Sequence, residues 1–220
     1  MALAIFDLDH TLLSGDSDHA WGQFLVDRGL VDPEVHKLRN DHFYEQYKAG
    51  TLDIHEYLEF AMRPLTEYEP DKMHAEREVF LDERIETLIS QRSRDLLRKH
   101  EEQGDTLLII TATNGFVTYP IAARLGVAHI IAPHPEVIEG RYTGKTVGVP
   151  SFHEGKVTRL KEWMETHKHN LEGSYFYSDS HNDLPLLRLV DHPVAVDPDP
   201  TLRAEAEKAG WPIISLVDPE

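Results

Sequence analysis

The sequence predicts an α/β fold: a doubly wound parallel sheet of the Rossmann type with an inserted all-helical cap. Three apolar runs of strand length each stop at a polar residue: residues 2–6 before Asp7, 107–110 before Thr111, and 175–177 before Ser178. Segments with apolar residues at helical spacing lie between these runs. Strands and helices that alternate in this way are typical of a parallel sheet covered by helices.

Two of the intervening segments have the spacing of crossover helices. The first has apolar residues at 81, 85, 88, 89, 96 and 97 and ends before Gly104. The second covers residues 116–125 and ends before Gly126. Glycine often ends a helix because it adopts the left-handed conformation at little cost. We therefore expect one helix in each segment.

Residues 15–80 show helical spacing and contain no strand-like run. Their apolar residues fall into three groups: Trp21, Phe24 and Leu25; Val35, Leu38, Phe43 and Tyr47; and Ile54, Tyr57, Leu58 and Ala61. Glycine and proline residues separate these groups, as expected for short helices that turn back on one another. The sequence therefore predicts a helical cap over residues 15–80 and a core of residues 1–14 and 81–220. A small hairpin is expected around Glu139-Gly140.

Composition restricts the classes of partner. The chain has 39 acidic and 22 basic residues and a formal net charge of −17, so we expect it to bind neither nucleic acids nor anionic membranes. It has no cysteine, which excludes disulfides and a cysteine nucleophile. It also has neither an apolar run of the ~20 residues that a membrane span needs nor a signal-like start. We expect a cytoplasmic protein, and no pattern indicates its oligomeric state.

Polar side chains follow the predicted strands. Asp7 and Asp9 lie two residues apart directly after the first apolar run, so an extended backbone places both carboxylates on the same side. Thr111 follows the second run, and Asp179 comes shortly after the third. Because such sheets bind ligands beyond the carboxyl ends of their strands, we expect these side chains to meet at one edge.

These residue types suit the chemistry of a phosphoryl group. A carboxylate that attacks a phosphate dianion meets charge repulsion, so the site must supply cations and neutral donors for the phosphate oxygens. Lys156, at the start of a helical segment, can provide one positive charge, and a divalent cation can provide more. Mg²⁺ is suitable because it takes oxygen ligands from few carboxylates and keeps several waters. Asp7 and Asp179 are the candidate metal ligands.

Each of these residues also has a plain structural explanation. Asp183 could cap the helix that begins near residue 184, and Thr111 could be an ordinary strand end. Lys156 could pair with Glu154 on a surface helix. The ordered occurrence of all of them after three strands and at the start of one helix favours the catalytic interpretation.

The sequence resembles the haloacid-dehalogenase superfamily, in the branch that contains phosphoserine phosphatase. The resemblance spans nearly the whole chain and rests on four motifs in the family's order: Asp7-Leu8-Asp9-His10-Thr11-Leu12, Thr111-Ala112-Thr113-Asn114, Lys156, and Asp179-Ser180-His181-Asn182-Asp183. It implies a haloacid-dehalogenase-like core and a Mg²⁺-dependent hydrolase that acts on small phosphate monoesters.

The resemblance also implies a role for each matching residue. Asp7 would attack phosphorus to give an aspartyl-phosphate, and Asp9 would protonate the leaving alcohol and later deprotonate water. Mg²⁺ would be held by the carboxylates of Asp7 and Asp179 and by the backbone carbonyl of Asp9. Asp183 would order the metal-bound waters. The phosphate pocket would be formed by Thr111, Ala112, Lys156 and Asn182.

The cap must select the leaving group. Phosphoserine phosphatases carry a glutamate nine residues after the nucleophile that meets the substrate ammonium, and here this position is Asp16, with Asp18 nearby. Their carboxylate-binding arginine is replaced by Ala61, beside Glu59 and close to Arg63. This pattern favours a substrate with an amine and no carboxylate. The chain also resembles histidinol-phosphate phosphatases of this branch, so L-histidinol phosphate is the leading substrate, ahead of phosphoserine and other small phosphomonoesters.

Two other classes of function share part of the pattern. A phosphomutase-like enzyme would pass the phosphoryl group from Asp7 to a sugar phosphate instead of to water. A non-enzymatic regulatory module would be phosphorylated on Asp7 to switch a partner, but such receivers lack an acid at the Asp9 position and have no cap. Asp16 and Asp18 could also serve only as helix caps ahead of Trp21.

Overall fold

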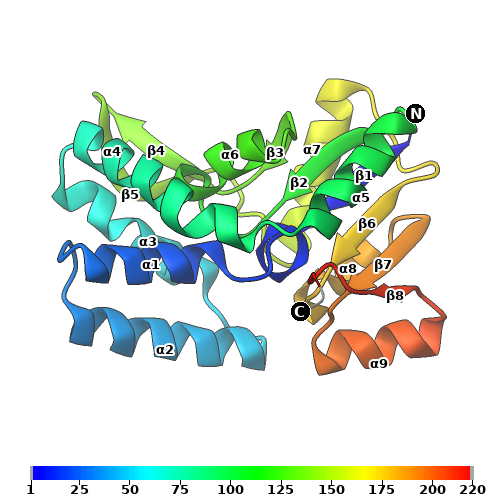
Figure 1. Ribbon diagram of the computed structural model, residues 1–220, viewed down its shortest axis with the longest axis horizontal. Helices are drawn as coiled ribbons and strands as arrows, with labels where there is room; N and C mark the ends of the chain where they lie inside the picture. The colour runs from blue at the N-terminus through cyan, green and yellow to red at the C-terminus, as the bar shows by residue number, and fades with distance from the viewer. Residues whose placement is uncertain (1, 219–220) are drawn as a thin grey trace.

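The computed structural model describes residues 2–218 and has a parallel β-sheet, which lies in the right half of the view in Figure 1. The sheet has six strands in the order β3-β2-β1-β6-β7-β8, and neighbouring strands pair in parallel. The strands are β1 (Leu3–Phe6), β2 (Thr106–Ile110), β3 (His129–Ile131), β6 (Tyr175–Ser178), β7 (His192–Val196) and β8 (Ile213–Ile214). The predicted parallel α/β sheet is confirmed, and β1, β2 and β6 match the three apolar runs.

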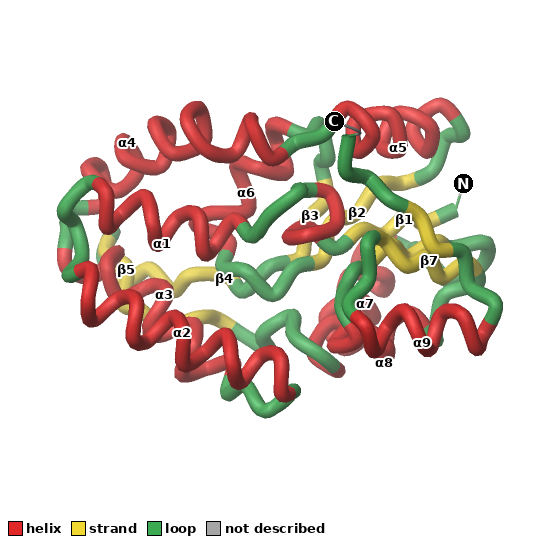
Figure 2. The backbone as a smooth tube through the Cα atoms, turned by 60° about the horizontal axis from the view of Figure 1, so that its bottom comes forward, coloured by secondary structure: helices red, strands yellow, loops and turns green. Residues whose placement is uncertain are grey.

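Helices cover both faces of the sheet (Figure 2). They are α5 (Gln91–Glu102), α6 (Gly115–Arg124), α7 (Glu154–His167), α8 (Leu184–Leu187) and α9 (Pro200–Ala209). Side chains along a strand alternate between the two faces. Ala4 and Phe6 therefore join a core with residues of α5 and α6, whereas Leu3 and Ile5 join a second core with residues of α7, α8 and α9. Strand β1 is thus buried on both sides, which explains its uninterrupted apolar sequence.

Four helices are inserted between β1 and α5: α1 (Ser17–Asp27), α2 (Pro33–Ala49), α3 (Ile54–Glu67) and α4 (Pro70–Phe80). Asp16, Asp32 and Asp53 precede the first three, and each side chain accepts hydrogen bonds from the first backbone amides of its helix. Gly50 ends α2 with a left-handed φ of 67°. The predicted helical insertion is confirmed. Within residues 2–218, no helix is both long and apolar enough to cross a membrane.

An antiparallel hairpin of β4 (His134–Ile138) and β5 (Arg141–Val147) forms a separate small sheet. The hairpin expected around Glu139-Gly140 is confirmed, and both turn residues have positive φ, as two-residue hairpin turns require. Strand β5 packs against α3, where a Cβ on Gly144 would lie 3.1 Å from Thr66 Cγ2. We therefore propose that the cap consists of residues 15–80 together with this hairpin, although the hairpin lies in the sequence segment assigned to the core.

The helical segment predicted from residue 81 to Gly104 contains a helix, α5, but its first part is not continuous with that helix. Residues 81–88 form a π-helical turn and then a 3₁₀ turn, and α5 starts only after a break. At this break Ile89 forms an antiparallel bridge with Leu13, and Ser90 caps α5. Tertiary pairing therefore overrides the local helical pattern, and it places the two chain connections between sheet and inserted helices side by side.

An aromatic cluster joins the inserted helices to one another and to α6. The ring centroid of Trp21 lies 5.1 Å from that of Phe80, 5.6 Å from that of Phe24 and 5.9 Å from that of Phe116 in α6. Phe80, at the end of α4, is fully buried. Because buried aromatic pairs contribute both apolar burial and ring contacts, this cluster stabilises the attachment of the cap.

Truncation of Phe80 should destabilise the protein strongly. We expect Phe80→Ala to lower the free energy of unfolding by ~3–5 kcal/mol in urea denaturation, because it removes a buried ring and leaves a cavity. Val35→Ala is the matched control: this α2 side chain is 57% exposed. Its loss should change the free energy by less than about 0.5 kcal/mol. A loss below about 1 kcal/mol for Phe80→Ala would contradict the proposed role of the cluster.

Candidate active site

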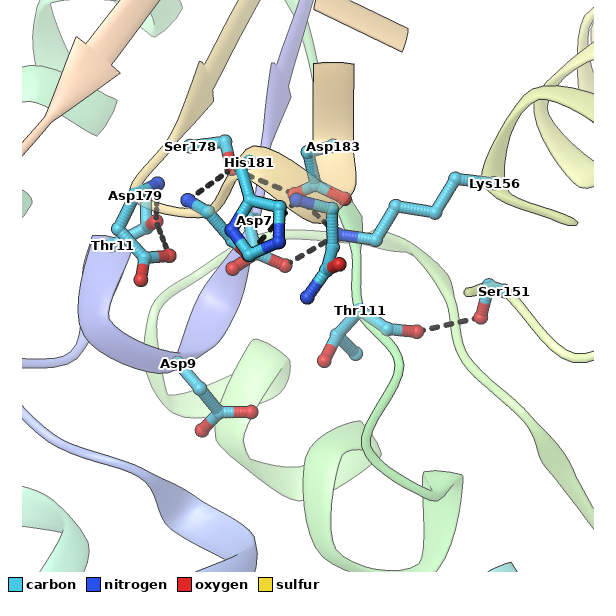
Figure 3. A network of polar contacts seen from close by, with 12 residues as sticks. Asp7, Asp9, Thr11, Thr111, Ser151, Lys156, Ser178, Asp179, His181 and Asp183 are labelled. Carbon is cyan, nitrogen blue, oxygen red and sulfur yellow. Dashed lines mark hydrogen bonds and ion pairs between the residues drawn. The ribbon is translucent and has the colours of Figure 1, made fainter. Parts of the chain in front are cut away.

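Asp7, Thr111 and Asp179 lie together at the carboxyl edge of the sheet (Figure 3). They follow β1, β2 and β6, and the parallel pairing of β1 with both neighbours brings the ends of these strands side by side. The backbone amide of Asp7 donates to the carbonyl of Tyr177 at 2.9 Å, so strand pairing continues up to this residue. The geometry of the sheet therefore holds the three side chains at one place.

Lys156 brings a positive charge to this edge, and its ammonium bridges two carboxylates. Nζ lies 2.7 Å from Oδ1 of Asp7 and 2.7 Å from Oδ2 of Asp183. Gly155 permits this close approach of α7, because a Cβ there would lie 2.0 Å from the carbonyl oxygen of Pro150. Burial lowers the pKa of Lys156, but the two carboxylates outweigh it, and the pKa lies above its ordinary value.

The plain structural explanations for Asp183 and Lys156 do not hold. Asp183 precedes α8, yet its side chain makes no capping hydrogen bond. Its carboxylate instead accepts hydrogen bonds from Lys156 and, at 2.7 Å, from the hydroxyl of Ser178. Lys156 is only 3% exposed, so it does not belong to a surface pair with Glu154. Both side chains therefore belong to the buried cluster.

The buried cluster carries more negative than positive charge. Burial raises the pKa of Asp7 to about 7, with Lys156 opposing and Asp183 adding to the shift. Burial, followed by the charges of Asp7 and Asp183, raises the pKa of Asp179 well above its usual range. The ammonium of Lys156 bridges Asp7 and Asp183, and the charges of these two carboxylates act on Asp179, so a further cation at this place would relieve the repulsion among the three.

The donor set fits Mg²⁺. Within residues 2–218, no three His, Cys, Asp or Glu side chains are placed to hold a metal by themselves. Mg²⁺ does not need such a cage, because it is usually bound through one or two carboxylates and keeps several waters. Asp7 and Asp179 are the proposed carboxylate ligands, together with the backbone carbonyl of Asp9. The hydroxyl of Thr11 donates to Asp179 Oδ1 at 3.1 Å and orients it.

Asp9 lies apart from the lysine cluster (Figure 3), and both of its carboxylate oxygens accept hydrogen bonds. The backbone amide of Ser17, at the start of α1, donates at 2.7 Å, and the hydroxyl of Thr113 donates at 2.8 Å. Burial and then the charge of Asp16 raise the pKa of Asp9 to about 7, while the two donors oppose this rise. A carboxyl group with such a pKa can both give and take a proton near neutral pH.

A cavity of about 500 Å³ opens over this edge. Its walls include all of the predicted core site residues: Asp7, Asp9, Thr111, Ala112, Lys156, Asp179, Asn182 and Asp183. The amide of Asn182 is 2% exposed, and among the described residues neither its nitrogen nor its oxygen has a hydrogen-bond partner. Because an unpaired buried amide is costly, a ligand in this cavity is the natural partner for it.

Two predicted cap residues lie near the cavity. Asp16 lines it while capping α1. Asp18 is not among the lining residues: its carboxylate accepts hydrogen bonds from the hydroxyl of Tyr57 and, at 3.2 Å, from Asn114 Nδ2. Burial and then the charge of Asp16 raise the pKa of Asp18 to about 7. Asp16 is therefore placed to meet a ligand, whereas Asp18 joins α1, α3 and the start of α6.

The structure corrects the predicted substrate contacts of Glu59 and Arg63. Both side chains are exposed, and Arg63 pairs with Glu67 at 2.9 Å. Glu59 faces a separate hollow of about 150 Å³ between α3 and β5. With 3.6 residues per turn, Glu59 points about 200° around the helix from Tyr57, which does line the cavity. A linear alignment did not reveal this rotation.

The structure also identifies residues whose role the sequence did not indicate. Thr113 holds Asp9, although the motif around Thr111 had pointed only to phosphate binding. Tyr47 was expected on the apolar face of a cap helix, but it lines the cavity and donates to Ser180 Oγ at 2.9 Å. Phe152, in the loop before α7, lines the cavity as well. Only the position of Thr113 within a motif could have signalled its role in advance.

Comparisons with known proteins agree with this geometry. A family model of haloacid dehalogenase-like hydrolases matches residues 4–188. The chain is 45% identical over 218 residues to a protein named histidinol-phosphatase from Neisseria meningitidis serogroup C, covering 97% of this chain and 98% of that protein. It is 31% identical over 220 residues to a phosphoserine phosphatase from Mycobacterium tuberculosis, covering 96% of this chain and 70% of that protein.

Solved structures show the same architecture. A crystal structure of a protein of unknown function from Bordetella pertussis Tohama I matches with a TM-score of 0.92 and 44% identity, over 98% of this chain and 99% of that chain. A substrate-bound phosphoserine phosphatase matches with a TM-score of 0.68 at 18% identity, over 98% of this chain and 93% of that chain. This similarity supports the fold alone. The chain therefore belongs to the haloacid dehalogenase-like hydrolases, and it is a phosphatase.

Proposed function

We propose that this phosphatase is a Mg²⁺-dependent phosphomonoester hydrolase that acts through an aspartyl-phosphate on Asp7, with L-histidinol phosphate as its substrate. One observation carries the mechanism: Asp7 and Asp9 line the same cavity, where Lys156 bridges Asp7 to Asp183 and Asp9 is held separately by Ser17 and Thr113. This arrangement provides a nucleophile, a phosphate-binding cation and an independent acid and base within one cavity.

In the first step, the Asp7 carboxylate attacks phosphorus and the bond to the leaving oxygen breaks. Asp9, held by Ser17 and Thr113, donates its proton to that oxygen. Lys156 and Thr111 would hold the phosphate oxygens. When bound, Mg²⁺ would offset the negative charges of the carboxylates and of the phosphate. The products of this step are the alcohol and an aspartyl-phosphate.

In the second step, water attacks phosphorus and releases Asp7. Asp9, now deprotonated, takes a proton from this water, so the same residue acts as acid and then as base. Asn182 lies in the wall with both amide atoms free, which suits it to hold a phosphate oxygen or a water through both steps. The cycle ends with inorganic phosphate and the starting carboxylate.

The charges around the cavity support an amino alcohol as the leaving group. Asp16 faces the cavity, and among the described lining residues there is no arginine. A substrate carboxylate would thus find no guanidinium partner, whereas an ammonium would find a carboxylate. Histidinol phosphate has an ammonium and no carboxylate, and the relative at 45% identity is named histidinol-phosphatase. Phosphoserine and other small phosphomonoesters remain the alternative substrates.

A comparison of substrates tests this proposal. With Mg²⁺ present, we expect kcat/KM for phosphate release to be at least about tenfold higher for L-histidinol phosphate than for phosphoserine or a generic aryl phosphate, a difference that corresponds to ~1.4 kcal/mol. A chelator should abolish turnover of all three. Equal rates for the three esters would refute the substrate and leave the phosphatase assignment standing. A phosphorylated acceptor formed from added sugar phosphate would indicate phosphoryl transfer instead of hydrolysis.

Asp7→Asn should remove the nucleophile without unfolding the protein. We expect kcat to fall by at least about a thousandfold, and acid quenching during turnover should trap no phosphorylated protein. Asp32→Asn, at the start of α2, is the matched control, because asparagine caps a helix as well as aspartate does. It should leave both readouts unchanged. Retained activity in Asp7→Asn would refute the mechanism, and an aspartyl-phosphate in the wild-type protein that persists for minutes would instead favour a regulatory module.

The pH profile should report the hydrogen bond from Thr113 to Asp9. Since the first step needs protonated Asp9, kcat/KM should fall as the pH rises through its pKa of about 7. Thr113 stabilises the charged carboxylate, so Thr113→Val should raise this pKa and move the alkaline limb upward by about one pH unit. Thr158→Val, on the exposed side of α7, should leave the profile unchanged. A shift toward lower pH would contradict the assignment of Asp9.

A further inference from the structure

The lining of the cavity combines two kinds of side chain. The carboxylates, Lys156 and Asn182 lie at the edge of the sheet. The lining also includes aromatic side chains: Phe43, Tyr44, Tyr47 and Tyr57 from the cap and Phe152 from the loop before α7. A phosphate monoester bound at the edge of the sheet would therefore share the cavity with aromatic rings. Charge alone does not explain these rings.

Tyr47 and Phe152 form a pair of rings that faces the cavity. Tyr47 comes from α2 and Phe152 from the loop before α7, and their centroids lie 6.3 Å apart with a tilt of 37° between the ring planes. Neither residue is a member of the two hydrophobic cores. Both are only partly buried. Core packing therefore does not account for their positions.

A hydrogen bond fixes the ring of Tyr47 in this position. Its hydroxyl donates to Ser180 Oγ at 2.9 Å, and Ser180, which is 5% exposed, directly follows Asp179. Elsewhere on α2, Phe43 is the one buried residue among those described. On the other side of the pair, the Phe152 ring lies edge-on to that of His153, with the centroids 4.3 Å apart. The ring of Tyr47 is thus held in place before a ligand arrives.

We propose that Tyr47 and Phe152 form a binding site for a flat ring in the leaving group, which makes them specificity-determining residues. Aromatic pairs favour centroid separations of about 4.5–7 Å. At 6.3 Å apart and tilted, the two rings leave a third ring room to lie within that range of both centroids. This inference deepens the proposed function and rests on it, because the imidazole of histidinol phosphate is such a ring. Asp16, in the same cavity, would then meet the ammonium.

The test compares esters that differ only in the ring. The first pair is L-histidinol phosphate and 2-aminopropyl phosphate, which keeps the amine; the second is 2-phenylethyl phosphate and ethyl phosphate, which have no amine. The readout is the kcat/KM of the ring-bearing ester divided by that of the ringless ester. We expect Tyr47→Leu and Phe152→Leu to lower this ratio by about tenfold in each pair. Tyr47→Phe keeps the ring and loses its hydrogen bond, so it should lower the ratio by only about threefold.

Leu38→Ala is the control on the same helix; its side chain is 73% exposed, and the ratios should not change. If Tyr47→Leu and Phe152→Leu lower kcat/KM equally for ring-bearing and ringless esters, the proposal is overturned and these residues have a structural role. If circular dichroism shows that one of these two variants does not fold, the other variant and Tyr47→Phe test the proposal.

The second pair of esters separates this proposal from the proposed substrate. If the wild-type enzyme shows no preference for histidinol phosphate over 2-aminopropyl phosphate, the proposed substrate fails. In that case, the ring site would still be supported if the wild-type enzyme prefers 2-phenylethyl phosphate over its ringless partner and Tyr47→Leu loses this preference. No ring preference in either pair of esters would overturn the ring site, whatever the rate of phosphate release.

Discussion

The two contacts of 2.7 Å from Lys156 to Asp7 and Asp183 are the interaction on which the catalytic edge depends. A buried ammonium and a buried carboxylate are each costly alone, and they are tolerated together because each offsets the other. Ser178 adds a hydrogen bond to Asp183, so the second carboxylate is fixed from two sides. This network sets the position of the Asp7 carboxylate, the proposed nucleophile.

The same network leaves more negative than positive charge at this edge. One ammonium cannot balance Asp7, Asp179 and Asp183, and burial makes the imbalance more costly, as the raised pKa values of Asp7 and Asp179 indicate. Asp9 avoids this competition because Ser17 and Thr113 hold it outside the cluster. Neighbouring carboxylates thus have separate environments, which supports the different roles proposed for Asp7 and Asp9. Asp9 depends on both the cap and the core for its orientation.

Much of the fold followed from the sequence for a simple reason. A strand buried on both faces needs an uninterrupted apolar run, and residues 3–6 and 107–110 supply such runs. Strand β7 escaped prediction because His192 and Pro193 interrupt its pattern, and β3 and β8 are only three and two residues long. The break before α5 also escaped, because Ile89 satisfies a helical pattern while it pairs with distant Leu13.

The sequence by itself determined the catalytic edge, since parallel strands bring their carboxyl ends to one side and the polar residues that follow them must meet there. Only the tertiary structure decided which cap side chains face the cavity. Asp16 and Tyr47 do, whereas Glu59 and Arg63 point elsewhere. The physical reason is that a helix presents a different side chain every 100° or so, and its rotation is set by packing against distant elements such as β5, which no local pattern encodes.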